Sequence, residues 1–146
     1  MRTARTARVL IWAALALQLA GLAWDGVWHG LLNPGVEPGT FPDMLVHLGT
    51  VHLVLYLGVL SVLITAGWAL VERRRGTALA FAGALLSTVA EAWHASIHLR
   101  MSTRGGPIAE AVAMIGFLVV VASVWAGRLY ERRRRPSSST PTRTAA

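Results

Sequence analysis

Apolar residues dominate the sequence in four long runs that short polar segments separate. Each run is about long enough to cross a ~30 Å hydrocarbon core as a helix, which takes roughly 20 residues. The runs cover residues 9–28, 44–71, 77–98 and 107–127. Because the connections between them are short, successive helices are expected to run antiparallel. The pattern therefore predicts an all-α integral membrane protein, an up-down-up-down bundle of four transmembrane helices.

The polar segments divide the chain further. Residues 1–8 form a basic tail, and residues 9–127 form the transmembrane domain. Residues 128–146 are basic and then rich in Ser, Thr and Pro, a composition typical of a disordered tail. At the helix ends, Asp43 is predicted to cap the second helix, and Pro107 suits the first turn of the fourth.

Arginine placement predicts the orientation in the membrane. The formal net charge is +7, and all fourteen basic residues are Arg. Only Arg100 and Arg104 lie away from the N-terminus, the 72–76 turn and the C-terminal segment. By the positive-inside rule both termini are cytoplasmic, and the loops 30–42 and 99–106 face outward. The distribution predicts a multi-pass protein of the cytoplasmic membrane, with lipid and not nucleic acid as its partner, and it is compatible with a homo-oligomer.

The first apolar run has a second interpretation. Basic residues followed by an apolar run and the small residues Gly21 and Ala23 are also the pattern of a signal peptide cleaved after Ala23. The run is longer than the typical signal core of about 7–15 residues, which favours a retained helix.

Ionisable residues within the apolar runs are few, and they gather on one side. In the predicted topology all of them, including all five histidines of the chain, fall in the outer half of the membrane. Such groups are rare in membrane helices and usually mark function. They are Asp25, His29, His47, His52, Glu91, His94, His98 and Glu110. We therefore expect one shared polar site, whereas Glu37 and Glu72 are expected to be loop charges.

Helical spacing predicts which of these side chains face one another. Asp25 and His29 are four residues apart and share a face. The third run places its carboxylate and two histidines within about 60° of arc. His52 lies about 140° around from His47, so both point inward only if the start of that helix is distorted. The predicted metal ligands are accordingly Asp25, His29, His47, Glu91, His94 and His98, with His52 as a weaker candidate ligand and Glu110 as a candidate acid or base.

Imidazoles and carboxylates at these spacings are how helical bundles build metal sites. The absence of cysteine excludes thiolate ligands, and the remaining donors suit Cu, Fe or Zn. The E-x-x-H at 91–94 is similar to half of the di-iron carboxylate pattern, and the H-x-x-x-H at 94–98 resembles one histidine box of membrane desaturases. Asp25 and His29 followed by His47 resemble the intramembrane copper site of copper membrane monooxygenases. Each resemblance covers two or three residues and assigns no family.

The number of candidate ligands fits a mono- or dinuclear metal site open to the outer side. One function this predicts is a metal-dependent oxidoreductase acting on a membrane-soluble or extracytoplasmic substrate. Alternatives are a non-enzymatic metal-binding or delivery protein and a small b-type cytochrome with bis-histidine haem b. Metal-free proton transfer and a purely structural polar network also remain open at this point.

Overall fold

The computed structural model describes residues 2–34, 36–72, 76–102 and 104–133, and all regular secondary structure within them is helical. This confirms the predicted all-α class. In chain order the elements are α1 (Arg2–Val27), the π-helical turn η1 (Trp28–Leu32), α2 (Phe41–Thr50), α3 (Leu53–Val71), α4 (Thr77–Leu99) and α5 (Gly106–Arg133).

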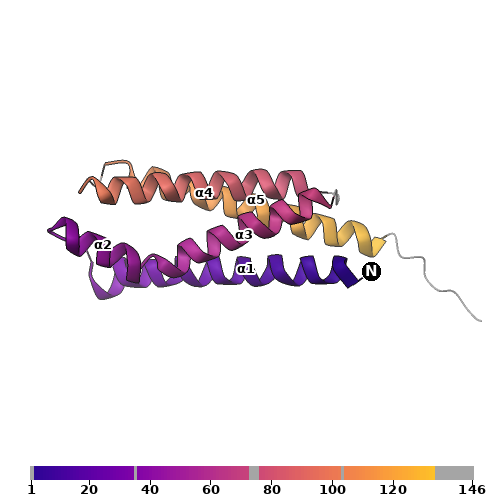
Figure 1. Ribbon diagram of the computed structural model, residues 1–146, viewed down its shortest axis with the longest axis horizontal. Helices are drawn as coiled ribbons and strands as arrows, with labels where there is room; N and C mark the ends of the chain where they lie inside the picture. The colour runs from indigo at the N-terminus through magenta and orange to yellow at the C-terminus, as the bar shows by residue number, and fades with distance from the viewer. Residues whose placement is uncertain (1, 35, 73–75, 103, 134–146) are drawn as a thin grey trace, which may run out of the picture.

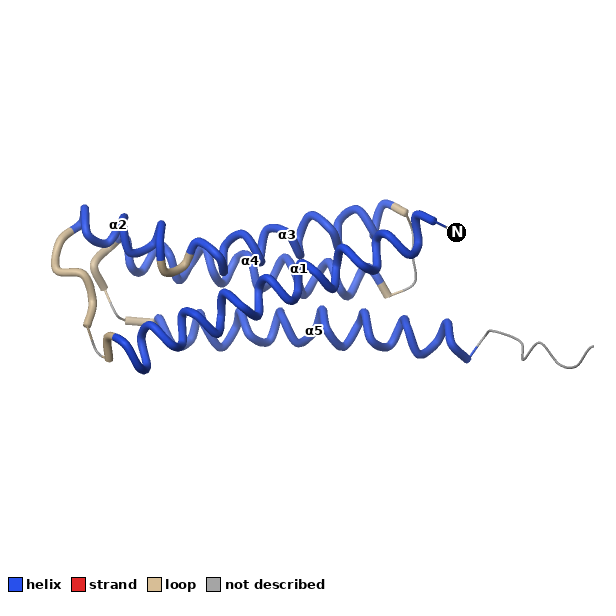
Figure 2. The backbone as a smooth tube through the Cα atoms, turned by 90° about the horizontal axis from the view of Figure 1, so that it is seen from below, coloured by secondary structure: helices blue, strands red, loops and turns tan. Residues whose placement is uncertain are grey.

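The long helices α1, α3, α4 and α5 lie side by side along the long axis of the molecule (Figure 1). The short elements η1 and α2 lie at one end, together with the loops that precede α2 and α5; we call this the loop end. The N-terminal end of α1 and the C-terminal end of α5 lie at the opposite end (Figure 2). The chain therefore reaches the loop end twice, once between α1 and α3 and once between α4 and α5.

Among the described residues, three helical segments are long and apolar enough to cross a membrane: Val9–Leu32, Leu53–Val71 and Gly106–Tyr130. The fourth long helix, α4, has the length but not the hydropathy, because Glu91, His94 and His98 lie in its last three turns. Large apolar side chains on the outer surfaces are exposed, as lipid-facing side chains are in a membrane helix. Examples are Leu19, Ile64, Val89, Ile115 and Leu118.

Glycines bring the helices together in two close pairs. A Cβ at Gly21 of α1 would collide with the backbone of α3, and a Cβ at Gly58 of α3 would collide with the backbone of α1. On α4, a Cβ at Gly83 would lie 2.8 Å from the carbonyl oxygen of Gly116 on α5, and the reverse distance is 2.6 Å. Small residues that allow close backbone approach are typical of membrane-helix interfaces. The molecule thus consists of an α1–α3 pair and an α4–α5 pair.

A core of small and apolar side chains joins the two pairs. Its members come from all four long helices and include Ala14, Leu15, Val62, Ala66, Ala80, Ala84, Phe117 and Val120. Nearer the loop end, one buried hydrogen bond crosses between the pairs, from Gln18 Nε2 of α1 to Ser87 Oγ of α4 at 3.0 Å. Beyond that bond the interior becomes polar.

The second predicted helix, residues 44–71, is broken in the structure. It divides into α2 and α3, with Val51 and His52 between them. The break follows Gly49 and Thr50, and the Thr50 hydroxyl donates to the Val46 carbonyl at 2.7 Å, a back-bond that tends to bend helices. α3 then begins with the His52 carbonyl accepting from the Tyr56 N–H at 3.0 Å.

The helix ends also differ in detail from the prediction. α2 begins at Phe41, and its N-cap is Thr40 instead of Asp43; the Thr40 hydroxyl accepts from the Asp43 N–H at 3.3 Å. Pro107 does lie in the first turn of α5, as predicted. α1 takes in most of the predicted basic tail, and α5 continues to Arg133, six residues into the predicted C-terminal tail. Residues 134–146 lie outside the described part of the chain.

Candidate metal centre

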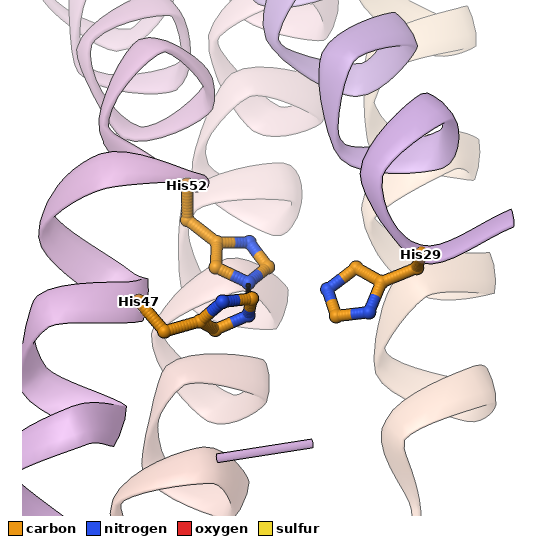
Figure 3. Close-up of side chains that lie close together, drawn as sticks. All are labelled: His29, His47 and His52. Carbon is orange, nitrogen blue, oxygen red and sulfur yellow. Dashed lines mark hydrogen bonds between the residues drawn. The ribbon is translucent and has the colours of Figure 1, made fainter. Parts of the chain in front are cut away.

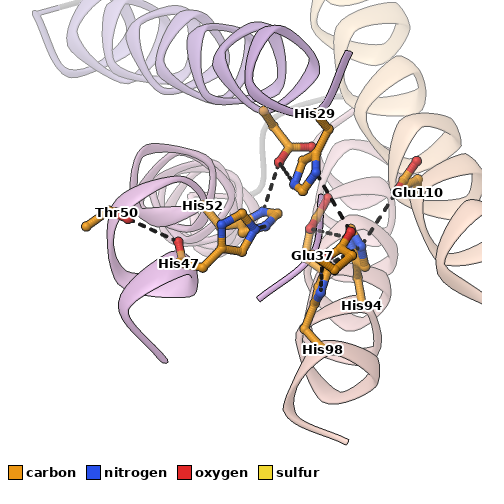
Figure 4. Close-up of polar contacts among 10 residues, drawn as sticks. His29, Glu37, His47, Thr50, His52, His94, His98 and Glu110 are labelled. Atoms are coloured by element: carbon orange, nitrogen blue, oxygen red, sulfur yellow. Dashed lines mark hydrogen bonds and ion pairs between the residues drawn. The ribbon is translucent and has the colours of Figure 1, made fainter. Parts of the chain in front are cut away.

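The five histidines meet at the loop end, inside the molecule (Figure 4). They come from three separate places in the chain: His29 from η1, His47 and His52 from the end of α2 and the junction with α3, and His94 and His98 from α4. Pairs of their ring centroids lie between 4.7 and 6.5 Å apart. The predicted polar layer is thus a single cluster, which we call the histidine cluster.

Within the histidine cluster, His29, His47 and His52 form a triad that could hold a metal ion. One ligand nitrogen from each lies within 4.8 Å of the other two, and Figure 3 shows the three rings turned toward a common centre. The Nε2 atoms of His47 and His52 are 3.2 Å apart. Two ligands of one tetrahedral ion lie about 3.3 Å apart when the metal–nitrogen bonds are about 2.0–2.1 Å. The spacing therefore matches that of two nitrogens sharing an ion.

The expectation that His52 faces away from His47 is wrong. His52 is 0% exposed and lies against His47, with the two ring centroids 5.0 Å apart. The helical-wheel angle of about 140° assumed an unbroken helix, whereas the break between α2 and α3 turns the second ring back toward the first. A signal for this break exists in the sequence, since Gly49 and Thr50 directly precede it.

His94 and His98 form a second pair, four residues apart on one face of α4. Their Nε2 atoms are 3.0 Å apart, and both side chains are more than nine-tenths buried. This pair adjoins the triad, because the centroids of His98 and His52 are 5.3 Å apart. The predicted shared face of α4 is therefore present, and it points into the histidine cluster.

A carboxylate lies near the Nδ1 atom of four of the five histidines. Asp25 Oδ1 is 3.1 Å from His52 Nδ1, and Glu91 Oε2 is 3.9 Å from His94 Nδ1. The carboxylate distances at His29, His94 and His98 are too long for hydrogen bonds. The 3.1 Å distance between Asp25 and His52 is short enough, but its orientation is poor, and neither atom makes a hydrogen bond within the described residues. The carboxylates thus surround the rings on the side away from the facing Nε2 atoms.

Glu37 is a member of the site that the sequence did not reveal. We expected a loop charge, but the loop before α2 folds back over the histidine cluster. Glu37 Oε1 lies 3.8 Å from His29 Nδ1, and Glu37 Oε2 lies 3.6 Å from His98 Nδ1. One carboxylate therefore spans the triad and the α4 pair. No periodicity could have indicated this contact, because the loop has no helical face.

Glu110 lies at the entrance to the site. It comes from the first turns of α5, its side chain is 57% exposed, and its Oε1 is 3.5 Å from His94 Nε2. An open cavity of about 300 Å³ begins here, and Glu37, Glu110 and three of the histidines contribute to its walls. The histidine cluster is therefore reachable by water and small molecules from the loop end.

Comparison of the chain with protein-family models, curated proteins and solved structures finds no match. The chemistry of the site therefore has to be derived from its geometry alone.

The paired Nε2 nitrogens are close enough for either a hydrogen bond or a shared cation. In the α4 pair the Nε2 atoms are 3.0 Å apart, so one N–H···N hydrogen bond joins the two rings when one Nε2 carries the proton. When both rings carry their proton on Nδ1, the two Nε2 lone pairs face each other, and a metal ion between them binds both. Outside the long helices, burial lowers the pKa of the His47 imidazole below its ordinary value, which favours its neutral, ligating form.

Proposed function

We propose that the chain is a metalloprotein of the cytoplasmic membrane that binds a transition metal ion through His29, His47 and His52. The observation that carries this proposal is the convergence of three imidazole nitrogens, from distant parts of the chain, within 4.8 Å of one another. Two of these residues, His47 and His52, are buried. Without a metal, three neighbouring imidazoles cannot all be protonated, because their buried positive charges would repel one another. A metal ion instead binds a lone pair of each ring.

All four long helices are proposed to cross the bilayer, with α2 and the loop before it lying at the outer interface. Three of the helices have the length and hydropathy of membrane spans. The ionisable residues of α4, Glu91, His94 and His98, are buried near its loop end, and the large side chains that it exposes elsewhere, among them Leu79, Leu85 and Val89, are apolar. The arginines flanking the opposite end favour a cytoplasmic location for both termini.

Imidazole ligands suit Cu, Fe and Zn, and three protein ligands leave a fourth position open, as in catalytic metal sites. Asp25 lies behind His52 in the position of a carboxylate that orients a ligating imidazole. The cavity leads small molecules to the cluster. We therefore favour a metal-dependent oxidoreductase that acts on a small membrane-soluble or extracytoplasmic substrate.

The close approach of the rings disfavours haem b. Bis-histidine ligation places the two Nε2 atoms on opposite faces of a macrocycle. Here the paired Nε2 atoms are 3.0 and 3.2 Å apart and face each other directly. A planar ring cannot lie between nitrogens at this spacing.

Metal content of the purified full-length protein tests the proposal. Wild type should carry at least one equivalent of Cu, Fe or Zn by mass spectrometry, and His52→Ala should lose most of it. Ser96→Ala is the matched control, because Ser96 lies on α4 at the loop end and, among the described residues, its side chain bonds to Trp93 and Arg100 and to no histidine. A wild-type protein that takes up no transition metal, even after incubation with each ion, would refute the proposal.

A further inference from the structure

The α4 pair carries an inference beyond the triad. His94 and His98 repeat the arrangement of His47 and His52: two buried rings with facing Nε2 atoms, at 3.0 Å in one pair and 3.2 Å in the other. The triad alone leaves this second arrangement without a function. A single tetrahedral ion has four positions and cannot take all five imidazoles of the histidine cluster.

The α4 pair also has a third donor of its own. Glu110 Oε1 lies 3.5 Å from His94 Nε2, the same atom that faces His98. Two imidazoles and one carboxylate with open positions form a donor set that first-row transition metals occupy in non-haem sites. Since Glu110 is 57% exposed, its side chain can move toward an ion without disturbing the core.

We infer that His94, His98 and Glu110 bind a second divalent transition metal ion, next to the ion held by the triad. The second ion uses the facing Nε2 atoms and the Glu110 carboxylate. Its remaining positions open into the cavity and take water or another small exogenous ligand. This inference rests on the proposed function for the first ion, and together the two ions form a dinuclear centre.

The supporting carboxylates agree with this assignment. Glu91 faces Nδ1 of His94 at 3.9 Å, and Glu37 faces Nδ1 of His98 at 3.6 Å. Carboxylates in this position orient ligating imidazoles and increase their basicity. Glu91 is only 3% exposed, and a carboxylate buried at this depth is costly in a membrane protein unless a positive charge lies nearby. The second ion supplies that charge.

Both proposed sites adjoin the open cavity. Its walls include all three ligands of the second ion, His94, His98 and Glu110, but of the triad they include His29 and neither His47 nor His52. The ring centroids of His52 and His98 are 5.3 Å apart, so the two proposed sites are neighbours. Because all three ligands of the second ion line the cavity, this ion is the more exposed of the two and meets an external ligand first.

A Co²⁺ titration of the metal-free full-length protein tests this inference, with the visible absorption of the bound ion as the readout. Wild type should bind two equivalents, and His98→Ala should bind one. Glu110→Gln should still bind two, with the second at least about tenfold weaker, as expected on losing a charged ligand. Because Glu110 is on the surface, Glu110→Gln should remove a ligand without unfolding the protein.

The outcomes also separate the two proposals. One equivalent in wild type, unchanged in His98→Ala and Glu110→Gln, would overturn the second site and leave the first intact. A single equivalent in wild type that disappears in both His52→Ala and His98→Ala would mean one shared ion and would also overturn the inference. No bound Co²⁺ in wild type would instead refute the first site. Ser96→Ala should match wild type throughout.

Discussion

Asp25 offers the sharpest test of how the first metal ion is held. Asp25 Oδ1 lies 3.1 Å from His52 Nδ1 and 3.7 Å from His29 Nε2, so one carboxylate oxygen faces two proposed ligands. Asp25→Asn keeps the size of the side chain and removes its charge. A neutral amide no longer attracts a proton to His52 Nδ1 by its charge, so the Nε2 lone pair is lost from part of the population.

The expected magnitude follows from these contacts. Loss of a carboxylate behind a single ligating histidine costs about 10–100-fold in metal affinity. Because Asp25 faces two of the three ligands, we expect an effect near the upper end, about 100-fold or about 2.7 kcal/mol. Without metal, Asp25→Asn should melt at or above the wild-type temperature, because a partly buried charge is removed.

Competition with a chromophoric chelator measures the affinity, and a melting curve in detergent measures the stability. Asp43→Asn is the matched control: it makes the same chemical change at the loop end, but its carboxylate contacts Thr40 and no histidine. An Asp25→Asn affinity within threefold of the Asp43→Asn value would refute the role of Asp25. So would a loss of affinity that only accompanied unfolding.

Three further predictions concern packing, orientation and protonation. Gly116→Ala should destabilise the protein by about 1–3 kcal/mol, because its Cβ would lie 2.6 Å from the α4 backbone. Gly26→Ala is the control, since no described atom lies within 4 Å of a Cβ there. Equal melting temperatures for the two variants would contradict the close α4–α5 pair. Reporter fusions in the loops before α2 and α5 should be extracytoplasmic, and those at Gly76 and the C-terminus should be cytoplasmic. A cytoplasmic signal from either loop would place the histidine cluster on the cytoplasmic side and contradict the proposed orientation. Metal should dissociate as the pH falls, because ligating imidazoles must be neutral. Burial lowers the pKa of His47, so half of the metal should be released below about pH 6.5. Release that begins above neutral pH would contradict ligation by His47.

The sequence predicted the all-α class, because long apolar runs have few alternatives to helix, but it did not predict that the second run divides into α2 and α3. It also predicted that Asp25, His29, Glu91, His94 and His98 gather at one end, since regular helices keep residues three and four apart on one face. The clustering of five rings follows from the alternating direction of the helices.

Two members of the site could not be predicted in this way, for two different reasons. His52 joins the triad through a helix break, and a helical wheel is valid only within one unbroken helix. Glu37 reaches His29 and His98 from a loop, where the backbone path depends on tertiary contacts that periodicity does not encode. Both residues lie where the backbone leaves regular helical geometry, His52 at the break between α2 and α3 and Glu37 in the loop before α2.

The division into two helix pairs means that each proposed ion has its own supporting frame. Every triad ligand belongs to the α1–α3 half of the chain, and every ligand of the second ion belongs to the α4–α5 half. The glycine contacts fix distances within each half, whereas the halves meet through a core of alanine and larger apolar side chains, the Gln18–Ser87 hydrogen bond and the Glu37 carboxylate. With both proposed ions bound, their separation would depend on how the two halves pack against each other, whereas the ligands of each ion would stay together within one half.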